Sequence, residues 1–167
     1  LGASSTNDNY YVHTQRGHYL LRHYSPDVSG VCRQQELRCQ HAAAAAGVAP
    51  APLCLNNHQR ILISEFLTHS RHFDWEQMQH FLPQLLDKLV LLHQLKVQTP
   101  VLEPELYLQQ LVVAARQTEW SAADDDCFVD LLNSARQFAA LPADLVLCHM
   151  DLHSGNILLR HQQLYLI

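Results

Sequence analysis

The chain has few of the basic residues that are typical of nucleic-acid-binding proteins and no long apolar run of the kind that is typical of membrane proteins. Lysine and arginine together number 11, against 16 aspartate and glutamate residues, and the formal charge is -5. This balance leaves no basic footprint for nucleic acid. The chain also lacks any run of the roughly 18 or more apolar residues that a membrane-spanning helix needs. We therefore expect neither nucleic acid nor a membrane as a partner.

Cysteine is scarce as well. The 5 cysteines are scattered and form no Cys-x-x-Cys pair, which is typical of reduced thiols and offers no zinc site, so we expect a cytoplasmic protein. Hydrophobic residues make up 48% of the chain, enough to bury a core. The sequence starts at Leu1 rather than Met and stops at Ile167 within an apolar alternating run. From this we expect both ends to be truncated.

The strongest signal is a polar loop between two apolar runs late in the chain. His149 and Asp151 form a His-x-Asp group, and Asn156 follows the Asp at the fifth position. The catalytic loop of kinases has this spacing: its Asp accepts the proton of the attacking hydroxyl, and its Asn holds magnesium on the nucleotide phosphates. We predict these roles for Asp151 and Asn156. The alternative is an ordinary polar turn, since Asp, Ser, Gly and Asn are all turn formers.

The first part of the chain has the pattern of a small sheet with one helix. Aromatic and β-branched runs flank turn residues in two places, which predicts two hairpins. Between them the composition favours a helix, which Gly47 and Pro50 end. The predicted strands are residues 10–13, 18–24, 53–55 and 61–66, and the predicted helix is residues 31–46.

From Asp74 onward the pattern changes to helix. Asp74 fits a cap, Pro83 fits a first-turn position, and leucines recur at helical spacing after it. The acidic run 124–126 fits the start of a helix, where negative charge is favourable. Further helices are predicted at 105–117 and 127–140, and short strands at 145–148, 157–160 and 164–167. We place a boundary between two lobes near residues 67–73.

With its polar loop reading His-Met-Asp-Leu-His-Ser-Gly-Asn at residues 149–156, this order of features resembles the aminoglycoside phosphotransferase and choline kinase superfamily. In detail it is similar to the bacterial thiamine kinase branch. The resemblance implies an α+β, protein-kinase-like fold with two lobes. Residues 1–67 would be the nucleotide-binding lobe, a small antiparallel sheet plus a helix. Residues 68–167 would be a mainly helical catalytic lobe, truncated and therefore incomplete.

The resemblance also implies a charged pair that serves ATP. Arg22 stands at the strand position that contacts the phosphates in this family, and Glu36 stands where a helix carboxylate orients that cation. Arg22 interrupts an otherwise apolar strand, which favours the paired interpretation. The alternative is a surface cation and a solvated carboxylate, since charged residues are usually exposed.

Two further segments correspond to nucleotide-binding parts of the family. Ser5, Thr6 and Asn7 lie in the segment that resembles the loop over the phosphates, and they offer hydroxyl, amide and backbone donors. Glu65 and Phe66 lie in the segment that resembles the hinge, which hydrogen-bonds adenine through its backbone. The cofactors that the resemblance implies are ATP and Mg²⁺.

The remaining implied site residues are histidines of the polar loop. His149 would hydrogen-bond backbone and so hold Asp151 in place, and His153 would either contact phosphate or brace the loop. The family's second magnesium ligand is an Asp directly after a strand like the one that ends at Ile167. Because the sequence stops there, we expect the 167-residue chain to be inactive.

We therefore predict an ATP-dependent kinase that moves the γ-phosphate to an alcohol group of a small, cationic molecule. Thiamine is the preferred acceptor, and choline, ethanolamine, an amino sugar or an aminoglycoside are the others. A second hypothesis is a nucleotide-binding module without catalysis, and a third is a fragment with no function of its own.

Overall fold

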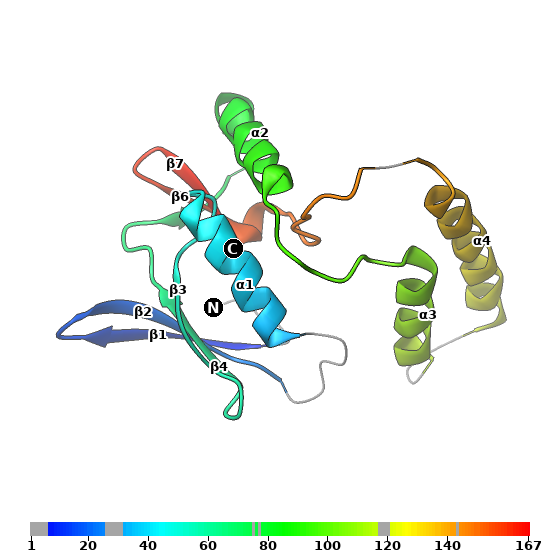
Figure 1. Ribbon diagram of the computed structural model, residues 1–167, viewed down its shortest axis with the longest axis horizontal. Helices are drawn as coiled ribbons and strands as arrows, with labels where there is room; N and C mark the ends of the chain where they lie inside the picture. The colour runs from blue at the N-terminus through cyan, green and yellow to red at the C-terminus, as the bar shows by residue number, and fades with distance from the viewer. Residues whose placement is uncertain (1–6, 26–31, 75, 77, 117–120, 143) are drawn as a thin grey trace. The chain divides into compact units, whose positions relative to one another are not determined.

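The computed structural model describes residues 7–25, 32–74, 76, 78–116, 121–142 and 144–167. The chain divides into two compact units, which are shown with their elements in Figure 1. Unit 1 comprises Leu1–Val97 and Val146–Ile167, and unit 2 is Gln98–Leu145. This division does not coincide with the boundary predicted near residues 67–73, and the two-lobed division remains a prediction.

A four-stranded antiparallel sheet forms the first part of unit 1, with strand order β1-β2-β4-β3. β1 (Asp8–Thr14) and β2 (Gly17–His23) make a hairpin, and β3 (Pro52–Asn56) and β4 (Ile61–Glu65) make a second one. Both predicted hairpins are confirmed. β4 is an internal strand, as its apolar sequence predicted, because β2 and β3 pair with its two edges.

Helix α1 (Arg33–Ala45) connects the two hairpins and ends as predicted at Gly47. Gly47 has a φ of +68°, and the N–H groups after the helix turn back to its last carbonyls, which satisfies acceptors that would otherwise lack partners. The side chain of Gln40 donates to Ser64 Oγ at 3.3 Å, so the helix is tied to β4. Its predicted first residues, up to 31, lie outside the described part of the chain.

A second sheet and a long helix complete unit 1. The sheet has the order β5-β6-β7, from β5 (Arg71–His72), β6 (Ile157–Arg160) and β7 (Gln163–Leu166), and the helix is α2 (Met78–Gln94). Apolar side chains of β6, β7, α2 and the turn after α1 form one buried core, whose members include Ile157, Leu164, Leu166, Leu85 and Val48. Leu166 N–H also donates to Val48 O at 2.8 Å. This core therefore holds the last strand against the end of α1.

Two expectations from the sequence are wrong. Residues 145–148 were expected as a strand, but they form no strand, and Leu145 is 72% exposed. Pro83 lies inside α2 rather than in its first turn. Asp74 does act as a cap, but of the turn ahead of the helix, because its carboxylate accepts the N–H of Glu76 at 3.1 Å.

Unit 2 consists of α3 (Pro104–Ala115) and α4 (Ala122–Ala139), which match the two predicted helices. Ser121 begins α4 with a capping box: its hydroxyl accepts the Asp124 N–H, and the Asp124 carboxylate accepts the Ser121 N–H at 2.7 Å. The Ser121 hydrogen bonds lower the pKa of Asp124. Arg136 of α4 pairs with Glu105 of α3 at 2.6 Å. Among the helices formed by the described residues, none has the length and apolarity that a membrane span requires.

Candidate active site

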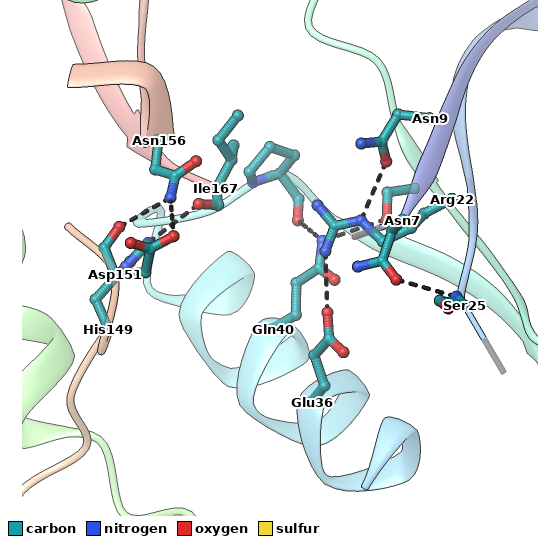
Figure 2. Close-up of polar contacts among 12 residues, drawn as sticks. Asn7, Asn9, Arg22, Ser25, Glu36, Gln40, His149, Asp151, Asn156 and Ile167 are labelled. Carbon is teal, nitrogen blue, oxygen red and sulfur yellow. Dashed lines mark hydrogen bonds and ion pairs between the residues drawn. The ribbon is translucent and has the colours of Figure 1, made fainter. Parts of the chain in front are cut away.

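The predicted catalytic loop places Asp151 and Asn156 in direct contact. The short helix η2 (Ser154–Asn156) turns the chain so that Asn156 Nδ2 donates to Asp151 O at 2.8 Å and to Asp151 Oδ2 at 2.9 Å (Figure 2). The Asp151 side chain is 77% exposed. An exposed carboxylate held in one orientation can accept the proton of a hydroxyl that approaches it.

The backbone of Asn156 is fixed from two sides. Its N–H donates to His153 O at 2.9 Å, and its carbonyl accepts the N–H of Ile167 at 2.9 Å. Because the side-chain amide nitrogen makes the contacts to Asp151, the oxygen Oδ1 remains as the atom for a cation. Magnesium prefers oxygen ligands of this kind, and it commonly takes only one or two from the protein. The residues present therefore fit a magnesium site at Asn156.

His149 joins the loop to the end of β7. Its Nε2–H donates to Ile167 O at 3.1 Å, which confirms the expected hydrogen bond to backbone (Figure 2). Burial lowers the pKa of His149, which favours the neutral form of the ring. Its other nitrogen, Nδ1, is buried and has no hydrogen-bond partner within the described part of the chain.

His153 is the cap of η2. Its Nδ1 accepts the N–H of Gly155 at 3.1 Å, and its Nε2 lies 3.7 Å from Asp151 Oδ2. Of the two roles predicted for this residue, the structure supports the brace of the loop. A contact to phosphate remains a prediction.

The predicted pair of Arg22 and Glu36 is confirmed. Arg22 Nη1 lies 3.0 Å from Glu36 Oε1, and both side chains are half-buried. Figure 2 shows Arg22 between Glu36 of α1 and Asn9 of β1, whose Oδ1 accepts Nε–H at 3.2 Å. The interpretation of Arg22 as a solvated surface cation is therefore wrong. Among the described residues, Asn9 and Glu36 thus hold the guanidinium through Nε–H and Nη1–H, and a contact of Arg22 with phosphate remains a prediction.

Two residues near this pair were missed by the sequence analysis. Asn9 is opposite Arg22 in the β1–β2 hairpin. Tyr24 is only 3% exposed, and its pKa is raised, first by burial and then by the charge of Glu36. The register of the hairpin was the signal that could have identified Asn9. Nothing in the local sequence distinguishes Tyr24 from an ordinary strand residue.

In the segment predicted as the hinge, two backbone N–H groups already make hydrogen bonds within the protein. Glu65 N–H donates to Ala51 O at 2.8 Å, and Phe66 N–H donates to His18 O at 3.2 Å. Any adenine contact made by these two residues must therefore use their carbonyl oxygens or side chains. The Phe66 ring packs against Tyr11 with their centroids 4.6 Å apart, and Glu65 lies 3.8 Å from Arg160 Nη1.

The segment predicted to cover the phosphates is described only at its last residue. Ser5 and Thr6 lie outside the described part of the chain. Asn7 Oδ1 accepts the N–H of Ser25 at 3.3 Å, which places Asn7 beside the end of β2 (Figure 2). No group of three His, Cys, Asp or Glu side chains that could bind a metal is found among the described residues.

Comparisons with known proteins bear on this site. Residues 1–167 match the model of the phosphotransferase enzyme family. No curated protein sequence matches the chain. The α+β fold is confirmed as kinase-like by its similarity to solved structures of small-molecule kinases.

Three such structures illustrate the similarity. The choline kinase LicA from Streptococcus pneumoniae has a TM-score of 0.84 and 18% identity, covering 99% of this chain and 60% of that one. An ethanolamine kinase from Plasmodium vivax has a TM-score of 0.69 and 18% identity, and the match covers 96% of this chain and 55% of that one. A spectinomycin phosphotransferase in complex with ADP and spectinomycin has a TM-score of 0.58 and 17% identity, and the match covers 99% of this chain and 60% of that one. The chain thus spans less than two thirds of each of these structures.

Proposed function

Because the chain belongs to the phosphotransferase enzyme family, we propose that the protein transfers the γ-phosphate of ATP to a hydroxyl of a small molecule. The observation that carries this proposal is the contact of Asn156 with Asp151, which fixes an exposed carboxylate beside an oxygen donor suited to magnesium. The hypothesis of a binding module without catalysis has no comparable support, since the base and its partner are both present and in contact.

The chemistry follows from the positions of these groups. The acceptor's oxygen forms a bond to the γ-phosphorus while its proton passes to the Asp151 carboxylate. The bond from that phosphorus to the bridging oxygen breaks, and its electron pair leaves on ADP. Asn156 Oδ1 would hold a magnesium ion, which neutralises charge on the phosphates when it is bound.

Arg22 supplies positive charge at a second point. Glu36 and Asn9 fix its guanidinium from two sides, so the cation is pre-oriented rather than mobile. A pre-oriented cation stabilises the charge of the phosphoryl group without reorganising during the reaction. Arg22 and Asp151 both belong to unit 1, and the hydrogen bond between Leu166 and Val48 ties the last strand to the end of α1.

The acceptor is proposed by class only. The compared structures are named for choline, ethanolamine and spectinomycin, which all carry a hydroxyl and an amine or ammonium group. Thiamine, which the sequence resemblance favoured, shares these features but has no counterpart among them. We therefore propose a cationic alcohol and retain thiamine as one of the candidates.

The test is ADP release by the full-length protein with ATP and Mg²⁺, offered thiamine, choline, ethanolamine and aminoglycosides in turn. Asp151→Asn is the matched control, because it keeps the shape of the side chain and removes the base. We expect acceptor-dependent release that falls by about 10²- to 10⁴-fold in Asp151→Asn. Binding of ATP with no release for any acceptor would select the binding module instead.

The 167-residue chain itself is a further arm of this test. The family resemblance places a second magnesium ligand directly after Ile167, so we expect no turnover from residues 1–167 alone. Robust turnover by this chain would contradict that expectation.

A further inference from the structure

The catalytic loop contains an interlock between His153 and Gly155 that the reaction outlined above does not use. A Cβ added to Gly155 would lie 2.8 Å from His153 Cε1 and 3.1 Å from His153 Nδ1. Carbon atoms in proteins essentially never approach so closely without displacement. An alanine at position 155 would therefore have to displace the imidazole ring of His153.

The hydrogen bond across this interlock fixes the chemistry of the ring. Nδ1 of His153 accepts the Gly155 N–H at 3.1 Å, so its lone pair is engaged. In neutral imidazole one nitrogen accepts and the other carries the proton. The proton of His153 therefore resides on Nε2, which is the nitrogen that faces Asp151.

The position of Nε2 distinguishes the two oxygens of the Asp151 carboxylate. Nε2 lies 3.7 Å from Oδ2, and the same Oδ2 accepts Asn156 Nδ2–H at 2.9 Å. Within the described residues no hydrogen-bond donor to Oδ1 is found. Oδ2 thus accepts one hydrogen bond, and Nε2 lies near the same oxygen at a distance beyond a hydrogen bond, a gap that catalytic contacts commonly close when substrate binds.

We propose that His153 is a positioning residue that, through its interlock with Gly155, holds Oδ2 of Asp151 and assigns Oδ1 as the oxygen that receives the acceptor's proton. This inference rests on the proposed function, because it concerns the same base. It goes beyond bracing of the loop, since a brace needs only the bond to Gly155, whereas orientation of the base also needs the ring nitrogen that faces Asp151.

His153→Asn separates these two roles. An asparagine side chain commonly accepts the N–H of the residue two positions on, so the new amide oxygen can replace Nδ1 as the partner of Gly155. The shorter side chain does not extend to Asp151 Oδ2. We expect this variant of the full-length protein to unfold at the wild-type temperature. We also expect its kcat to fall by about 10- to 100-fold, with KM for ATP and acceptor unchanged, because a misplaced base slows only the chemical step.

Gly155→Ala provides an independent route to the same effect. In the wild-type background its methyl group displaces the ring, and we expect a similar fall in kcat. In the His153→Asn background the ring is gone, and we expect no further loss. A wild-type kcat in His153→Asn would show a brace only, and equal losses from Gly155→Ala in both backgrounds would show that no interlock exists. Either result overturns the proposal, whereas a wild-type protein without turnover overturns the proposed function first.

Discussion

At the scale of single residues, the Arg22–Glu36 pair makes the most direct link between sequence and chemistry. We expect Glu36→Gln to raise KM for ATP by about tenfold, because the guanidinium loses the charge that orients it towards phosphate. The free energy of unfolding should change little, since both side chains are partly exposed and solvent screens their attraction.

Steady-state kinetics with varied ATP would measure this effect. Glu103→Gln, at an exposed position of unit 2, is the matched control and should leave KM for ATP at the wild-type value. If the two variants behave alike, Arg22 does not need its partner in order to bind ATP.

A second residue-scale prediction concerns the dependence of stability on pH. Burial lowers the folded-state pKa of His149, so between that pKa and the ordinary value near 6.5 the unfolded chain binds the additional proton. Stability is therefore complete above about pH 6.5 and is lost as the pH falls through the folded-state pKa. Urea unfolding from pH 7.5 to 5 should show a steeper loss for the wild type than for His149→Gln. An equal slope in the two proteins would contradict the prediction.

Individual site residues were predictable where a short motif fixed their spacing. Asp151 and Asn156 were predicted as site residues because a kinase catalytic loop has this spacing; the structure brings the two into contact, and their roles remain predictions. Asn9 was missed although the hairpin could have revealed it: with Thr14 opposite Gly17, the same register places Asn9 opposite Arg22. Tyr24 was missed because its burial depends on packing that no local pattern encodes.

At the scale of elements, the β6–β7 hairpin contains an avoidable strain. Its two turn residues, His161 and Gln162, have φ values of +48° and +65°. Two-residue turns of this kind favour Asn-Gly, because other side chains resist a positive φ. We expect His161→Asn with Gln162→Gly to stabilise the chain by about 1 kcal/mol.

Chemical denaturation would measure this gain. Gln163→Gly is the control, because residue 163 belongs to β7 and a glycine within a strand should destabilise it. If the double variant of the turn unfolds at the same denaturant concentration as the wild type or at a lower one, the turn is not strained.

The elements themselves were predicted well where a turn or a helix stop delimited them. The two hairpins of the first sheet follow from turn residues between β-rich runs, and α1 ends at the glycine that its sequence offers. The strand predicted at 145–148 was wrong because an apolar run is not sufficient for a strand. A strand also needs a neighbouring strand with free backbone groups, and that depends on distant parts of the chain. The first-turn position predicted for Pro83 was wrong because a proline near the start of a helix constrains the helix boundary only within about one turn.

At the scale of the whole molecule, the core around β7 determines whether unit 1 is held together. Leu164 is fully buried, and its neighbours in the core come from β6, α2 and the turn after α1. We expect Leu164→Ala to cost about 2 to 5 kcal/mol, because the deletion leaves a cavity. Leu53→Ala, at an exposed position of β3, should cost far less. Thermal unfolding of both variants would show whether the core contributes this much to the free energy of unfolding.

The kinase-like architecture was predicted from the order of the motifs rather than from any single element. The division of the chain could not be predicted in the same way. Residues 146–167 belong with unit 1, although 98–145 separate them from it in sequence. Sequence patterns report local periodicity, and this return of the chain is decided by the packing of β6 and β7 against α2 and the end of α1.

The consecutive backbone amides of Leu166 and Ile167 donate to two different parts of unit 1. The N–H of Leu166 binds Val48 after α1, and the N–H of Ile167 binds Asn156 in the catalytic loop. A nascent chain leaves the ribosome from its N-terminus onward, and its early segments can fold before the later ones appear. The first sheet and α1 can therefore form during translation, whereas the catalytic loop gains its last anchor only once residue 167 has emerged. The site can therefore assemble only after residue 167 has been synthesised, later than the first sheet and α1.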